Sequence, residues 1–466
     1  MKLKGEYYQF ILHLIPNQES ITTLNSKVPP ILYLKALFYS KLFPILLAFI
    51  VVGCATSGSS EKRESSASES YLEGTFALDQ QKAPPNDIQS IRLHPKGQPG
   101  QAPIMELNTS QKLLLSFDYL GTQNRQFRVT VDHYSKSWNR SGIGPNTYLD
   151  SFSETTIQAS KISFGQRPSY HHVEFSFPNN ELRPAVSGNY LIKVYSTDDN
   201  SLLFSMPFFV TENEGQIETT VERLFAQRND GRPLDQLFST YHYPNFVEYP
   251  QFDLSMSFVP NQFWGRTKQV EFLDTITPSQ LRGYIEHDNA FVGNYEFKHL
   301  DLQNFDGNGQ QILEHQPGVT PPRVTLRRDV QNLDPSPNLS EATVNMGMPD
   351  DDRNSNYAQV EFRLQTDDSI PPSSKIYIVG HFNNWMINDL NRMSFDSDKQ
   401  MWTGRALIKQ GSYAYKYVLV RDNQIDDLTL DQGFLSAQQE YLTFIYFKDP
   451  HQNFDRLLKV DGIIQR

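Results

Sequence analysis

The sequence has 466 residues, of which 38% are hydrophobic and 12% aromatic. That content suffices for packed cores in about three domains of roughly 150 residues, and it is too polar for a protein with several membrane spans. The formal net charge of −11 argues against the nucleic-acid-binding class, which needs a basic surface to displace counterions from phosphate.

The only cysteine, Cys54, ends an apolar run that extends from Leu42 to Val52 and follows Lys41. The run is shorter than the ~20 residues of a membrane-spanning helix, but it suits the apolar part of a signal peptide. Residues 51–54 resemble the bacterial lipobox, so we expect Cys54 to be lipidated. The alternatives are a buried free cysteine or an ordinary cleaved signal. A single cysteine also excludes intrachain disulfides and cysteine-based metal sites.

The signal-like run begins about forty residues into the sequence, whereas secretory signals normally start within the first few residues. We therefore expect translation to start near Leu32 or Leu34, at a non-AUG codon. We assign residues 1–53 to the signal-peptide region. Residues 54–70 are small, polar and charged, which is typical of a flexible tether.

Short apolar or alternating runs recur along a first predicted domain, residues 71–213, with turn-forming residues between them. Val173, Phe175 and Phe177 alternate with polar residues, as a strand buried on one face requires. Strands of this length and spacing predict an antiparallel sandwich. The runs lie at residues 90–95, 102–107, 112–120, 126–134, 171–178, 189–196 and 202–212.

The rest of the sequence also favours strands, so the predicted fold class is all-β, with tandem immunoglobulin-like β-sandwich domains. A second β-rich domain is predicted over residues 214–333, with one short helix at 218–227. Residues 334–356 are rich in Pro, Asn, Asp and Ser and are typical of a linker. A third domain is predicted over residues 357–449, followed by a C-terminal tail, 450–466.

The sequence has no nucleophile elbow, zinc-protease, P-loop or dinucleotide-binding motif. We therefore predict a non-enzymatic protein without catalytic residues, cofactor or metal. Residues 304–309 favour a tight turn over a calcium loop. Neighbouring His171 and His172 should point to opposite faces of a strand, so they cannot chelate one ion. Four further residues have side chains suited to acid–base chemistry, but their spacing does not predict a common site. They are His94, Asp118, Asp132 and His133.

Residues 375–420 contain a turn with Gly380, Phe382, Asn383 and Trp385, and later a strand with Gly411, Tyr413, Tyr415, Lys416 and Tyr417. This pattern resembles the early-set immunoglobulin-like sandwich of glycogen-binding modules and kinase regulatory subunits. The resemblance implies a glycan platform at Trp385, with Lys416 beside it.

The second tryptophan of that family's sugar site has no counterpart, because Ile425 stands in the corresponding turn and cannot stack as an indole does. Trp402 lies within a predicted strand and should be a core residue. We therefore expect Trp385 to define the fold rather than to bind sugar.

Residues 88–120, 138–154 and 175–195 resemble, in order, blocks of the N-terminal domain of type IX secretion system plug proteins. The blocks include an LHPxG turn, an LLLSFD strand and a Trp followed by TyrLeuAspxPhe. The resemblance implies a non-enzymatic protein that closes a large outer-membrane translocon β-barrel from the periplasmic side. Trp138, Tyr148 and Phe152 are candidate partner contacts, although packing within the domain is the favoured role for them.

Ala55 follows the cysteine, and the resemblance to bacterial lipoproteins then implies an outer-membrane anchor that faces the periplasm. A tether of about sixteen residues keeps the first domain within about 20–25 Å of the bilayer.

The favoured function is a plug or gate of the type IX translocon, with that barrel and the outer membrane as partners and no nucleic acid. The alternative is an outer-membrane glycan-binding lipoprotein that uses the C-terminal sandwich.

Overall fold

The computed structural model describes residues 72–158, 160–164, 167–225, 233–270, 272–293, 297–306, 311–331, 353–430 and 439–465. The chain divides into two units, Met1–Ala67 and Ser68–Arg466, and every described residue belongs to the second. The predicted signal region, Cys54 and the tether lie outside the described residues, as does most of the predicted linker. No helix in the described ranges has the length and apolar character needed to cross a bilayer.

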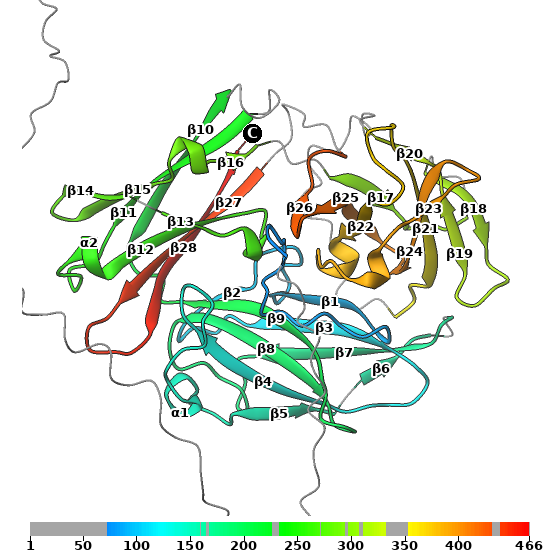
Figure 1. Ribbon diagram of the computed structural model, residues 1–466. Coiled ribbons are helices and arrows are strands. Elements are labelled where there is room, and N and C mark those ends of the chain that lie inside the picture. Colours follow the sequence, from blue (N-terminus) through cyan, green and yellow to red (C-terminus); the bar gives the residue numbers. More distant parts are fainter. Residues whose placement is uncertain are drawn as a thin grey trace, which may run out of the picture. The chain divides into compact units, whose positions relative to one another are not determined.

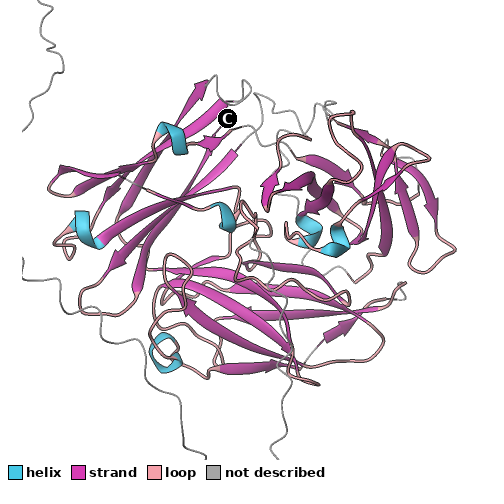
Figure 2. Cartoon of the chain, in the orientation of Figure 1, coloured by secondary structure: helices cyan, strands magenta, loops and turns pink. Residues whose placement is uncertain are grey.

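Strands dominate the described residues and helices are short (Figure 2), so the β-rich class predicted from sequence is confirmed. The strands of the described residues form six sheets, which pair face to face so that each pair encloses a hydrophobic core. Each pair of sheets is called a sandwich here and is numbered in chain order. The helical segments are α1 (Pro145–Tyr148), α2 (Pro250–Asp253), η1 (Trp264–Arg266), η2 (His287–Asn289), η3 (His381–Asn383) and η4 (Asp389–Asn391).

The first sandwich contains all seven runs predicted as strands between residues 90 and 212 (Figure 1). Alternation along β7 is confirmed, because Val173, Phe175 and Phe177 are buried while Glu174 and Ser176 are only partly so. The short outer strands β5 and β6 were not predicted, since they carry few apolar residues. One sheet is β1 (Ile88–Pro95), β3 (Leu113–Leu120), β7 (Tyr170–Phe177) and β6 (Ser160–Ile162); the other is β2 (Ile104–Glu106), β9 (Leu202–Thr211), β8 (Gly188–Ser196), β4 (Phe127–Tyr134) and β5 (Glu154–Ile157).

The second sandwich combines strands from the middle of the chain with the last two strands. One sheet is β10 (Gln216–Phe225), β11 (Pro233–His242), β15 (Gln280–Tyr284) and β14 (Phe272–Thr277), with β16 (Phe291–Val292) beside β11. The other is β13 (Lys268–Gln269), β12 (Leu254–Pro260), β27 (Gln439–Lys448) and β28 (Asp455–Gln465).

The short helix predicted at residues 218–227 is wrong, because its described part lies in β10. All ten residues of β10 pair with β11, from Gln216 opposite His242 to Phe225 opposite Pro233. The β-branched residues Thr219, Thr220 and Val221 favour the extended backbone. Pairing across ten residues therefore outweighs the helix-like apolar spacing.

The third sandwich begins well before the boundary expected from sequence. One sheet is β17 (Lys298–Asp301), β25 (Ser412–Arg421) and β22 (Lys375–Gly380), with β26 (Gln424–Asp426) beside β25. The other is β18 (Ile312–Gln316), β19 (Arg323–Leu326), β21 (Tyr357–Gln365), β24 (Met401–Lys409) and β23 (Ser394–Asp396), with β20 (Asp329–Val330) beside β21.

Strand pairing thus differs from the predicted division into residues 214–333, 357–449 and 450–466. Strands β17 to β20 join the third sandwich, while β27 and β28 return to the second, where Phe258 lies opposite Thr443. The third sandwich is inserted between β16 and β27. Such long-range pairing has no local signature, because periodicity reports a strand and its buried face but not its partner.

Candidate functional site: three joints between the sandwiches

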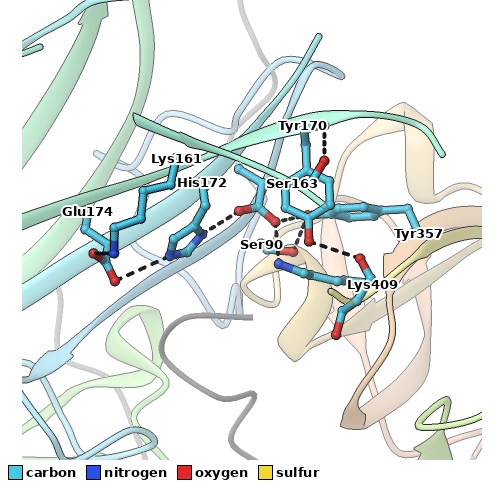
Figure 3. Close-up of polar contacts among 10 residues, drawn as sticks. Ser90, Lys161, Ser163, Tyr170, His172, Glu174, Tyr357 and Lys409 are labelled. Carbon is cyan, nitrogen blue, oxygen red and sulfur yellow. Dashed lines mark hydrogen bonds and ion pairs between the residues drawn. The ribbon is translucent and has the colours of Figure 1, made fainter. Parts of the chain in front are cut away.

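A buried polar cluster joins the first sandwich to the third, and is called the polar joint here. Asp118 on β3 lies opposite His172 on β7, and Tyr357 on β21 lies opposite Lys409 on β24. The Asp118 carboxylate accepts hydrogen bonds from His172 Nδ1 at 2.7 Å, Lys409 Nζ at 2.8 Å and the Tyr357 hydroxyl at 2.6 Å. Ser90 Oγ lies 2.7 Å from the Tyr357 hydroxyl. Figure 3 shows Ser90, His172, Tyr357 and Lys409 converging from the two sandwiches.

Solvent is almost excluded from the polar joint, since Asp118 is 0% and Lys409 3% exposed. Burial raises the pKa of Asp118, but the hydrogen bond from His172 and the positive charge of Lys409 outweigh that effect and hold the pKa below its ordinary value. Burial and the neighbouring Asp118 carboxylate raise the pKa of the Tyr357 hydroxyl well above 10. Because three donors engage both oxygens of the carboxylate, and two of these donors come from the third sandwich, this arrangement is suited to holding two sandwiches together.

The four acid–base candidates from the sequence do not meet in one site. Asp118 belongs to the polar joint, whereas Asp132 pairs with Lys193 at 2.6 Å and Arg140 at 2.9 Å. The Nδ1 atom of His94 lies 2.9 Å from the carbonyl of the next residue, Pro95.

The predicted divergence of His171 and His172 is confirmed. His171 Nδ1 lies 2.9 Å from Ser160 Oγ, while His172 contacts Asp118. In the described part of the chain no group of three or more His, Cys, Asp or Glu side chains could hold a metal.

An apolar cluster joins the first sandwich to the second, and is called the aromatic joint here. The Phe209 ring centroid lies 4.8 Å from that of Trp264 and 4.9 Å from that of Phe444. Trp138 packs edge-on against Phe209 at 5.7 Å. These contacts are stabilised by the burial of apolar surface and by the relative orientation of the rings, so they depend little on any one atom. At the boundary Arg456 donates to Glu212 at 2.6 Å.

His133 on β4 lies at the rim of the aromatic joint, with its ring 5.5 Å from that of Phe454. Burial lowers its pKa to about 4, although the Ser187 carbonyl and the Asp455 charge act in the opposite direction. The neutral ring donates from Nε2 to the Ser187 carbonyl at 3.1 Å. Gly188 is required beside it, because its φ is +138° and a Cβ there would lie 2.3 Å from the ring.

A third joint connects the second and third sandwiches with the segment that precedes β1. The Trp385 ring lies 5.1 Å from Phe263, 5.0 Å from Phe297 and 5.7 Å from Phe76. Arg266 donates to Asp427 at 2.9 Å and covers the Phe76 ring at 3.9 Å.

Lys416 lies inside the third joint. It is 1% exposed, and its ammonium lies 3.9 Å from the Asp427 carboxylate. Burial raises the pKa of Asp427, but Arg266 and then Lys416 outweigh it and lower the pKa overall. This lysine is therefore engaged within the protein, and the half-buried Trp385 is the part of the proposed glycan platform that reaches the surface. Trp402 is 1% exposed, which confirms its predicted core role.

The three candidate partner contacts differ in how far they are exposed to solvent. Trp138 is 8% and Tyr148 3% exposed, whereas Phe152 is 67% exposed. The Tyr148 hydroxyl donates to the Val131 carbonyl at 3.2 Å. Phe152 is thus the one of the three whose ring is available to a partner.

Comparisons with known proteins match the first sandwich most specifically. Residues 88–212 match the family model described as "Type 9 secretion system plug protein 1st domain". This confirms the resemblance predicted for the first domain. No curated protein matches the sequence.

Among solved structures, a hypothetical protein from Parabacteroides merdae ATCC 43184 has a similar fold. Its TM-score is 0.74 at 21% identity, and the alignment covers 83% of this chain and 99% of that one. At this identity the similarity concerns the fold alone. The C-terminal domain of the Streptococcus agalactiae AgI/II polypeptide BspA aligns at 6% identity over 80% of this chain and 98% of its own. Its TM-score of 0.14 is too low to indicate a common fold.

Proposed function

We propose that the protein is a non-enzymatic accessory of the type IX secretion system that plugs or gates the outer-membrane translocon barrel from the periplasmic side. The match of residues 88–212 to the plug protein first domain carries this proposal. Family membership of that domain favours a location in the cell envelope and an association with the secretion machinery.

The three joints give the protein the fixed shape that such a role requires. A pore wide enough for folded cargo leaks unless a body of fixed shape fills it. Asp118 ties the first sandwich to the third through Lys409 and Tyr357, and Phe209 ties the first to the second through Trp264. Because the third sandwich is inserted in the second, two chain crossings also restrain it. Relative motion between the sandwiches is therefore costly, which suits a plug.

A lipid on Cys54 would complete this arrangement. One acyl anchor and a short tether raise the effective concentration of the first sandwich at a barrel embedded in the same membrane. The Cys54→Ser variant should then weaken retention in the outer membrane without changing the contacts of the folded part.

The direct test is a pull-down of the full chain, tagged at its C-terminus, from native outer membranes in mild detergent. We expect a very large β-barrel in near-stoichiometric amount by mass spectrometry, and less of it with Cys54→Ser. Recovery of the chain without any such barrel would contradict the proposal.

One observation favours glycan binding as a second candidate. Trp385 lines a pocket of about 200 Å³ together with polar side chains that include Asn384 and Gln262, and an indole beside amides suits a sugar ring. Trp385→Ala distinguishes the candidates, and Trp402→Phe serves as a matched core variant.

If Trp385 only packs, Trp385→Ala should lower the free energy of unfolding by about 2–4 kcal/mol and leave polysaccharide retention in affinity gels unchanged. A folded Trp385→Ala protein that loses retention, with retention kept in Trp402→Phe, would instead establish the glycan function.

A further inference from the structure

An aromatic ladder crosses the outer face of the second sandwich. Phe238 on β11, Tyr284 on β15 and Phe272 on β14 are successive cross-strand neighbours. Their rings are stacked, with centroids 5.8 Å apart between Phe238 and Tyr284 and 5.6 Å apart between Tyr284 and Phe272. The ladder ends at Phe272, the outermost ring, which is 42% exposed.

Strand β14 forms the edge of this sheet, at the end of the order β10-β11-β15-β14 (Figure 1), and the single turn of α2 contacts it. Among the described residues no strand pairs with its outer side. Five of its six residues are exposed, Ile276 to 51%. An exposed edge with apolar side chains offers unpaired backbone groups to another extended segment.

The row of residues beside the ladder is charged. Arg282 on β15 lies between Thr240 on β11 and Asp274 on β14, and its guanidinium covers the Phe238 ring at 5.0 Å. The row therefore runs from a cation in the sheet to the Asp274 carboxylate at its edge. A strand added beyond β14 would place one side chain beside Phe272 and, two residues further along the same face, another beside Asp274.

We propose that the edge of β14 binds an extended segment of a partner protein by strand addition. The segment carries an aromatic residue that continues the ladder beyond Phe272 and, two positions away, a lysine or arginine that pairs with Asp274. Alternating side chains give this site its specificity, while backbone hydrogen bonds to the edge give much of its affinity. The inference stands apart from the proposed function, because it rests on the second sandwich alone.

Charge argues for a foreign segment over a second copy of this chain. Strand β14 itself carries an acid, Asp274, two residues after its ring at Phe272. Two copies joined through β14 therefore could not place a base beside each Asp274 while stacking their Phe272 rings. In a parallel pairing the two Asp274 carboxylates would be neighbours, which is destabilising, and in an antiparallel pairing that stacks the Phe272 rings Asp274 would lie opposite Val270.

The test uses the full chain and a short fluorescein-labelled peptide of alternating threonine and valine, with one phenylalanine and one lysine two positions later. Binding is followed by fluorescence anisotropy. Phe272→Ser should weaken binding about 2- to 10-fold, the range expected for loss of one aromatic pair. Asp274→Lys should weaken it about 2- to 5-fold, and should bind more tightly the peptide in which glutamate replaces lysine.

Matched controls are Leu390→Ser, at an apolar residue that is 55% exposed in the third sandwich, and Asp368→Lys, in an exposed turn after β21. Both should bind like the parent chain. Equal losses in the controls, no inversion with the glutamate peptide, or no binding up to the solubility limit would each overturn the proposal. Sedimentation showing a dimer that Phe272→Ser abolishes would overturn it in favour of a second copy.

Discussion

The polar joint and the aromatic joint hold the same first sandwich by different physical means. In the polar joint one carboxylate, Asp118, collects three directional hydrogen bonds in a nearly dry site. In the aromatic joint Phe209 shares its contacts among Trp138, Trp264 and Phe444. The first depends on each partner being present, because a buried unpaired charge is costly, whereas the second can repack around a similar volume.

The largest effect should come from removing the central carboxylate. Asp118→Ala leaves the Lys409 ammonium buried without its counter-ion, so we expect the free energy of unfolding to fall by about 3–5 kcal/mol. Urea unfolding followed by tryptophan fluorescence measures the change.

A double variant separates the loss of the charge pair from the cost of leaving one charge buried without a partner. Asp118→Leu with Lys409→Met removes both charges, so it should cost far less than Asp118→Ala alone. Glu361→Ala, which breaks the pair with the 56% exposed side chain of Arg405, should cost less than about 1 kcal/mol. A double variant as unstable as Asp118→Ala would contradict the role given to the buried charge.

Acid should weaken the two joints in sequence, beginning at the rim of the aromatic joint. The folded pKa of His133 is about 4 against an ordinary 6.5, so the unfolded chain takes up a proton as the pH falls below 6.5 while the folded chain does not. We expect His133 to cost about 2–3 kcal/mol of stability between pH 7 and pH 4.

Asp118 acts at lower pH. Because its folded pKa is lowered, its stabilising contribution is complete above about pH 3.9 and is lost only as the pH falls further. Urea unfolding from about pH 2 to pH 7 tests the order, with His133→Gln as the control. That variant should flatten the decline between pH 6.5 and 4, and a decline that persists in it would assign the effect to other groups.

The smallest effect should come from a conservative change in the aromatic joint. Phe209→Leu keeps an apolar side chain of similar volume, so the free energy of unfolding should fall by less than about 1.5 kcal/mol. Thermal and urea unfolding measure it beside Asp118→Ala. If Phe209→Leu proved the more damaging of the two, the contrast between the joints would be wrong.

Much of the first sandwich was predictable because its strands are short apolar or alternating runs separated by turns, and β7 alternates at Val173, Phe175 and Phe177. The joints were not, because the sequence does not distinguish a residue buried against another sandwich from one buried in its own core or exposed to solvent. Asp118 offered one signal, since it sits in a strand apolar on both faces: Phe117 points into the core and Leu114 is also buried. A charge in such a strand implies a buried partner but does not name Lys409, 291 residues away.

The resemblance of residues 88–212 to plug proteins could be recognised from several motifs that occur in the same order along the sequence. The roles of single residues could not be recognised in this way. Trp138 and Tyr148 stand in a recognisable loop with Phe152, yet only Phe152 is exposed. Burial depends on what packs over a loop, which the residues of the loop alone do not specify.

The most direct test of the plug proposal is electrical. The translocon barrel would be purified from cells that lack this protein, inserted in a planar bilayer, and measured before and after the full chain is added to the periplasmic side. We expect a fall in conductance that the heat-unfolded chain does not cause. Conductance unchanged at saturating amounts of the folded chain would contradict it.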